Sequence, residues 1–345
     1  MRNFQLPAAS CQHSFNKITL TLAALDHLKP RFFRLQAYLC QFNLKGMWAL
    51  FAVASAVFLG TYDVFKKLSL NSNAVLPVLF LATLTSAIIF LPILLISTFY
   101  PDSLSNSILF IPPAPLAQHG YFFLKSVIVT SSWIFTFFAV KHLPLTIVSP
   151  IRATGPIWTL FGAILIFSEH LTIIQWIGTA VTLLFFYIFS LAGKSEGIHF
   201  STNKWIVFII VGTLLGSVSG LYDKFLIHNF DRMAVQAWSG IYQVGLLLPV
   251  ILFLWYPKRH ENTPFQWRWS IPMIGLFLVI ADFLYFYAIS LDGSLISVIS
   301  ALRRSGVIIS FALGGILFHE KNIRQKGWLL VGILAGVMIL LFGSK

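Results

Sequence analysis

The feature that most constrains this chain is a series of apolar runs, each about 20 residues long, separated by short polar breaks. About 20 apolar residues are what one helix needs to cross the hydrocarbon layer of a bilayer. Of the 345 residues, 57% are hydrophobic and only 10% are charged, which rules out an ordinary soluble protein. We therefore predict an all-α integral membrane protein with about ten transmembrane helices. They cover residues 47–65, 74–98, 121–140, 145–167, 171–191, 205–222, 233–255, 270–289, 294–318 and 327–343.

Residues 1–46 differ from the rest of the chain. They carry six Lys or Arg against one acid, and their only apolar run, residues 18–25, is too short to span a membrane. A transit peptide is one interpretation of such a basic, acid-poor stretch. We favour a simpler hypothesis, in which these residues are an upstream extension that is not part of the mature protein, because Met47 directly precedes the first strong apolar run.

An internal repeat divides the remaining chain into two halves, residues 47–192 and 204–343. Tyr62-Asp63 near the end of the first predicted helix recurs as Tyr222-Asp223 near the end of the sixth. Further along, Arg152, Gly155, Phe167 and Glu169 recur in the same order as Arg303, Gly306, Phe318 and Glu320. Five helices per half is an odd number, so the halves are expected to cross the membrane in opposite senses. Inverted repeats of this kind build many secondary transporters.

The fourth predicted helix of each half resembles a family motif. The segment Ser149–Trp158 leads to Phe167-Ser168-Glu169, and the segment Ala301–Gly306 leads to Phe318-His319-Glu320. With two five-helix halves, these motifs resemble the EamA-like transporters of the drug/metabolite transporter superfamily. The resemblance implies ten helices around a central cavity and both termini in the cytoplasm. One departure is Ser168 or His319 before the acid, where such proteins often have Gly.

The distribution of positive charge disagrees with that implied orientation. Connections after odd-numbered helices hold eleven Lys or Arg, and those after even-numbered helices, with the C-terminus, hold four. Adding the six from the extension makes the totals eleven and ten, so the positive-inside rule leaves the orientation open. The plasma (inner) membrane is the expected location.

Charged residues within membrane spans are costly, which makes them functional candidates. Asp282, Arg303, Arg304 and Arg152 lie deepest along their predicted helices, whereas Asp63 and Asp223 lie closer to an interface with water. The arginines offer forked donors that fit a carboxylate or a phosphate. Arg303 and Arg304 point about 100° apart, so one is expected to face the cavity and the other to pair with Asp282 or the backbone.

Two interpretations of Asp282 stay open. It is either a carboxylate that couples transport to protons or one member of a static ion pair with an arginine. Lys66 and Lys67 follow Asp63 at i+3 and i+4, so either ammonium can reach its carboxylate, and Tyr62 shares a face with Lys66. These residues either line a cavity mouth or anchor the helix at the interface; for Lys67 we favour the anchor.

Two further features of the fourth helices are structural predictions. Glu169 and Glu320 end their helices, where the macrodipole disfavours a carboxylate, so each is expected to pair nearby or to cap the next helix. Pro150 and Pro156 flank Arg152 and are expected to loosen that helix.

The sequence therefore predicts a secondary transporter that moves a small polar metabolite, with an anionic group engaged by Arg303 or Arg304, by alternating access. The alternative is a flippase for lipid or polyprenyl-linked sugar, and an integral membrane enzyme is a distant third. The sequence contains no P-loop, no G-x-S-x-G elbow and no second His after His319-Glu320, so we expect no enzyme, cofactor or metal. Expected partners are a solute and membrane lipid but no nucleic acid, with a monomer favoured over a homodimer.

Overall fold

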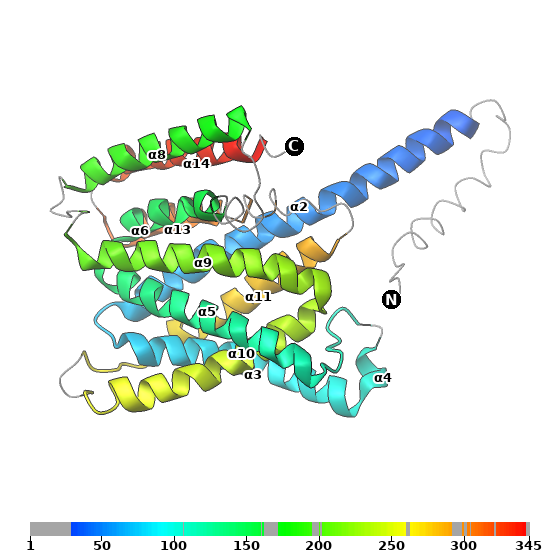
Figure 1. The fold of residues 1–345 in the computed structure, drawn as a ribbon, viewed down its shortest axis with the longest axis horizontal. Helices are drawn as coiled ribbons and strands as arrows, with labels where there is room; N and C mark the ends of the chain where they lie inside the picture. The colour runs from blue at the N-terminus through cyan, green and yellow to red at the C-terminus, as the bar shows by residue number, and fades with distance from the viewer. Residues whose placement is uncertain are drawn as a thin grey trace.

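A computed structural model describes most of the chain (Figure 1). The described residues are 29–105, 107–159, 161, 172–194, 200, 202–259, 263–291, 299, 302–303, 305–320 and 322–342. Helices account for nearly all of them, and no strand occurs among them. The prediction of an all-α protein is confirmed.

Within the described residues, six helices are long and apolar enough to cross a membrane, which makes the chain a multi-pass integral membrane protein. They are α2 (Lys29–Leu70, apolar from Trp48), α3 (Val75–Phe99), α5 (Leu116–His142), α9 (Lys204–Asn229), α10 (Arg232–Val250) with its continuation η1 (Ile251–Trp255), and α11 (Ser270–Ser290). The other elements are α4 (Pro101–Leu104), α6 (Leu145–Ala153), α8 (Ile173–Lys194), α13 (Gly306–Leu317) and α14 (Ile323–Phe342).

Several helices are longer than their apolar runs. Helix α2 begins at Lys29 and ends at Leu70, α9 ends at Asn229, and α5 begins at Leu116 directly after Pro115. The predicted ends at residues 65 and 222 and the predicted start at residue 121 were wrong. The physical reason is that the polar residues at those ends are bonded inside the protein, so the helix does not need to stop where the apolar run stops.

Helix α6 shows the predicted effect of two prolines. It ends at Ala153, Thr154 forms a turn that donates its N–H to Ile151, and helical backbone resumes at residue 155. Pro150 lies inside α6 and Pro156 lies just after the turn. Proline lacks the N–H that continues a helix, and two of them around one turn break the fourth helix beside Arg152.

The helices pack in pairs that each join the first part of the chain to the second. Helix α2 lies along α11, α5 along α9, α3 along α10, α6 along α13, and α8 along α14 (Figure 1). At two other contacts between the halves, α11 with α3 and α13 with α2, only glycine fits. A Cβ on Gly275 would lie 2.4 Å from the carbonyl oxygen of Ala82, and a Cβ on Gly306 would lie 2.4 Å from that of Ala56. Glycine therefore lets α11 and α13 approach the helices of the first half closely.

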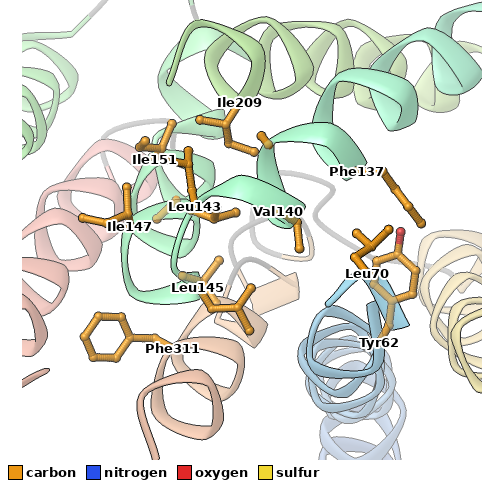
Figure 2. Packing of buried hydrophobic residues seen from close by; sticks show 14 of the residues in the cluster. Tyr62, Leu70, Phe137, Val140, Leu143, Leu145, Ile147, Ile151, Ile209 and Phe311 are labelled. Atoms are coloured by element: carbon orange, nitrogen blue, oxygen red, sulfur yellow. The ribbon is translucent and has the colours of Figure 1, made fainter. Parts of the chain in front are cut away.

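The largest apolar cluster forms around the short helix α6. Figure 2 shows Leu145, Ile147 and Ile151 of α6 beside Leu143, with Phe311 of α13 and Ile209 of α9 on two sides. Each of these six side chains is buried or nearly so. The cluster extends to Tyr62 and Leu70 of α2, opposite Phe137 of α5 (Figure 2). This packing holds α6, and with it Arg152, in a fixed place between α2, α9 and α13.

Candidate functional site

Seven charged side chains lie inside the helices and form three ionic groups. The groups are Asp63 with Lys66 and Arg152, Asp282 with Arg303, and Asp223 with Lys125. Six of these seven residues were candidates, or neighbours of candidates, on sequence grounds. The structure thus brings together charges that are far apart along the chain.

The first group joins α2 to α6. Lys66 Nζ donates to Asp63 Oδ1 at 2.8 Å, and Arg152 donates to Asp63 Oδ2. Lys66 Nζ also lies 4.2 Å from the centre of the Tyr62 ring, which is a favourable cation–π position. The predicted reach of Lys66 and its shared face with Tyr62 are both confirmed.

Asp63 does not lie at a watery interface. It is seven residues, or about 10 Å, from the end of α2, and its side chain is only 4% exposed. Asp223 is likewise six residues, or about 9 Å, inside the end of α9, and its side chain is 9% exposed. The prediction that these two acids meet water is corrected, because helices α2 and α9 continue beyond them and cations neutralise them.

The second group lies between α11 and the helical residues 302–303. Arg303 donates to Asp282, and its guanidinium lies 4.1 Å from the centre of the Tyr285 ring. Its Nε atom is buried and has no hydrogen-bond partner among the described residues. The predicted pairing of an arginine with Asp282 is therefore observed, with Arg303 as the arginine; Arg304 lies outside the described residues.

The third group contains a residue that the sequence analysis missed. Lys125 of α5 donates to Asp223 of α9, and its ammonium lies 5.1 Å from the centre of the Phe286 ring of α11. Lys125 was counted with the connecting residues in the charge totals because it lies only four residues from the start of the predicted run at residue 121. The signal that could have found it is Pro115, which marks an earlier helix start and places Lys125 nine residues inside the helix.

Tyr222 is not part of that group. Its hydroxyl donates to the carbonyl oxygen of Tyr121 at 3.3 Å, and its ring packs against Phe225. The sequence repeat Tyr62-Asp63 and Tyr222-Asp223 therefore places the two acids in ion pairs, but gives the two tyrosines different surroundings.

The three groups differ in exposure. The side chains of Arg152, Arg303 and Asp282 are 17%, 20% and 26% exposed, whereas those of the other four members are 9% exposed or less. The first two groups lie on helices in contact, because α2, which carries Asp63, packs along α11, which carries Asp282. The accessible part of the site is thus formed by two guanidinium groups and one carboxylate.

The formal charge of the seven side chains is +1, from four cations and three acids. A small excess of positive charge and guanidinium donors favour a ligand with an anionic group. No group of three or more His, Cys, Asp or Glu that could hold a metal ion occurs among the described residues.

Glu320 caps a helix of the other half and not the next helix along the chain, so the prediction that it caps the next helix was wrong. Its two carboxylate oxygens each accept one N–H from the first turn of α6, from Leu145 and from Thr146, both at 2.7 Å. Lys326 Nζ donates to the Thr146 hydroxyl at 3.0 Å. Glu169, the equivalent residue of the first half, lies outside the described residues.

Lys67 also caps a helix, in this case at the C-terminal end of α5. Its ammonium donates to the carbonyl oxygens of Val140 and Leu143 at 2.8 and 2.7 Å, at the end of α5. It therefore caps α5 and does not reach Asp63.

Comparison with known proteins identifies the first half. Residues 46–191 match the model of the EamA-like transporter family. This segment of the chain is EamA-like. The resemblance found in the sequence motifs is confirmed over these residues, and the EamA match indicates a membrane transporter of the drug/metabolite type.

The fold of the whole chain is also found among solved structures. One crystal structure superposes with a TM-score of 0.55 at 14% sequence identity, over 87% of this chain and 98% of that chain. At this identity the likeness shows a shared fold alone. No curated protein matches the sequence significantly.

Proposed function

We propose that the protein is a secondary active carrier that moves a small polar metabolite with an anionic group by alternating access. The observation that carries the proposal is the partly exposed pair Arg303–Asp282 beside Arg152, in a chain whose other paired membrane charges are buried. A charge is expensive inside a membrane protein, and a partly exposed one is typical of a substrate or ion pathway.

The chemistry of Arg303 supports an anionic ligand. A guanidinium has five N–H donors, and Arg303 uses one nitrogen on Asp282 while its Nε has no partner among the described residues. A carboxylate or phosphate of the solute would satisfy the remaining donors. Arg152, whose side chain is 17% exposed, would add a second accessible guanidinium.

The contacts between helices support two inverted five-helix repeats. Under the predicted repeat, α2, α3, α5, α6 and α8 correspond to α9, α10, α11, α13 and α14. The contact α2–α11 in this scheme is equivalent to the contact α9–α5, and the contact α3–α11 is equivalent to α10–α5. All four of these helix pairs are in contact. Helices α2 and α9 also run in opposite directions (Figure 1), as inversion requires.

A matching contact at the equivalent glycines supports the same repeat. Gly306 of α13 packs against the backbone of Ala56 in α2. Its counterpart Gly155 accepts a hydrogen bond at 3.0 Å from Ser217, and Ser217 follows the residue equivalent to Ala56 in α9. The two halves therefore use the same region of their first helices to hold the fourth helix of the other half.

The flippase of lipid or polyprenyl-linked sugar stays the alternative, because a phosphate headgroup would also suit the arginines. An enzyme is not proposed. The seven charged residues include no nucleophile with an adjacent general base, which acyl or phosphoryl transfer would need.

The experiment is a thermal-shift screen of the purified protein, followed by counterflow in proteoliposomes. The panel contains mono- and dicarboxylates, phosphorylated metabolites, zwitterions, cations, phosphatidylglycerol and undecaprenyl phosphate. Saturation at about 100 times Kd stabilises the folded state by about 2.7 kcal/mol, which is readily seen as a higher melting temperature.

Three variants make the screen specific. Arg303→Gln removes the guanidinium, Arg303→Lys keeps the charge without the fork, and Arg324→Gln makes the same chemical change at an exposed position of α14. We expect a water-soluble anion to stabilise the wild type and Arg324→Gln, and to lose its effect in both Arg303 variants. Counterflow of that anion would establish carriage. Stabilisation by the lipids alone would replace the carrier with the flippase.

A further inference from the structure

Residues that are equivalent in the two halves have different ionic partners. In the first half, Asp63 of α2 pairs with Arg152 after the first turns of α6. The repeat-equivalent residues of the second half are Asp223 and Arg303, and they do not pair with each other. Asp223 pairs with Lys125, and Arg303 pairs with Asp282.

Both substitute partners come from equivalent helices. Lys125 is on α5 and Asp282 is on α11, which are the third helices of the two halves in the predicted repeat. Asp282 is also within electrostatic range of Lys125 and Asp223. The Lys125 ammonium also lies 5.1 Å from the ring of Phe286, one helical turn from Asp282 on α11, so the two pairs form one cluster of four charges that joins the two halves.

We propose that Asp223 and Arg303 form an ion pair in the opposite state of the carrier, and that Lys125 prevents this pair in the state described here. The inference rests on the proposed inverted-repeat carrier. If the halves are inverted copies, then the state that opens to the other side has the arrangement of each half exchanged. The second half would then adopt the pairing that Asp63 and Arg152 now show.

Lys125 is the residue that decides the pairing. Its side chain is 7% exposed and it belongs to the first half, whereas the other three charges belong to the second. While Lys125 neutralises Asp223, Arg303 stays paired with Asp282. When α5 withdraws Lys125 from α9, a buried carboxylate without a partner is costly, and Arg303 is the nearest cation of the cluster that can replace Lys125.

The exchange of ion-pair partners gives Asp282 a defined role in the transport cycle of the proposed carrier. Its carboxylate loses Arg303 in the same step in which Asp223 gains it. Asp282 is then the one acid of the cluster without a cation, and it can accept either a proton or a positively charged group of the solute. Lys125 is thus a positioning residue that acts on Asp282 through Asp223 and Arg303.

The test measures pairing and needs no substrate. A double-mutant cycle between Asp223→Asn and Arg303→Gln is measured by apparent melting temperature in three backgrounds: wild type, Lys125→Met and Lys67→Met. Lys67 is the matched control, since it is a partly buried lysine whose partners are backbone carbonyls. Lys125→Gln serves as a second variant that keeps a hydrogen-bond donor near Asp223.

In the wild type and in Lys67→Met, the non-additivity of the two melting-temperature shifts is expected to be smaller than in the Lys125 variants, because Asp223 is paired with Lys125 and Arg303 with Asp282. In Lys125→Met and Lys125→Gln, the cycle is expected to be non-additive by about 2 °C or more, because coupling energies of contacting charges are about 0.5–3 kcal/mol. Additive shifts in both Lys125 variants would overturn the proposal. So would equal coupling in all backgrounds, which would mean that the Asp223–Arg303 pair exists without removal of Lys125. If the thermal-shift screen and the counterflow assay find no solute, the carrier proposal fails. The coupling measured between Asp223 and Arg303 does not depend on that result.

Discussion

Replacement of Glu320 tests how a residue of one half holds a helix of the other. Its carboxylate accepts the N–H groups of Leu145 and Thr146, which are 1% and 0% exposed, so water cannot replace it. Glu320→Ala leaves two buried donors unsatisfied, at about 1–3 kcal/mol each, or about 2–6 kcal/mol in all. Glu320→Gln keeps one acceptor oxygen and leaves one backbone N–H unsatisfied, which should lower the stability by about 1–3 kcal/mol. Loss of the negative charge at the helix N-terminus should lower it further, by about 0.3–1 kcal/mol.

The assay is chemical unfolding of the purified protein, followed by tryptophan fluorescence. The matched control is Asp102→Asn, which removes one exposed acid in the short helix α4. We expect the order Asp102→Asn, Glu320→Gln, Glu320→Ala from least to most destabilised. Glu320→Ala with the stability of the wild type would refute the capping argument, and equal losses for Gln and Ala would mean that charge rather than acceptor number matters.

Three further predictions concern the packing and the charges. Lys67→Met should destabilise the protein by about 1–3 kcal/mol, because the carbonyls of Val140 and Leu143 lose a charged donor, and Lys67→Arg should recover part of the loss in the same unfolding assay. Gly275→Ala should lower the melting temperature through its clash with Ala82, whereas Gly240→Ala, with open space around its Cβ position, should leave it equal or higher. Asp63→Asn should cost about 3–5 kcal/mol, because it leaves the buried Lys66 and the partly exposed Arg152 without their carboxylate, and a wild-type melting temperature would contradict the ion-pair geometry.

The membrane class and the local contacts could be predicted from the sequence because they depend on short-range rules. Apolar run length predicts spanning helices, and the i, i+3 spacing predicted that Lys66 reaches Asp63. The two prolines around Thr154 predicted the break in the fourth helix. In each case the residues that decide the feature are within one or two helical turns of each other.

The partners of the acids could not be predicted in the same way. Asp63 finds Arg152 at a separation of 89 residues, and Asp223 finds Lys125 at 98 residues. Hydropathy even argued against Lys125, because a lysine at the edge of an apolar run looks like a loop residue. Only the packing of α5 against α9 shows that its charge lies inside the protein.

The cost of buried charge explains why a carrier would use four charges where two would bind a solute. Removing one partner of a buried pair costs about 3–5 kcal/mol, which is more than the few kcal/mol that separate two accessible states. A state change that simply broke the Lys125–Asp223 link would therefore populate the second state rarely. If Arg303 replaces Lys125 at Asp223, only Asp282 is left without a cation. Asp282 is the most exposed of the three acids, at 26%, so water, a proton or the solute can compensate it at the lowest cost. The exchange of partners thus requires that the three acids differ in exposure. The acid left without a cation, Asp282, is then the one that water or the solute can reach.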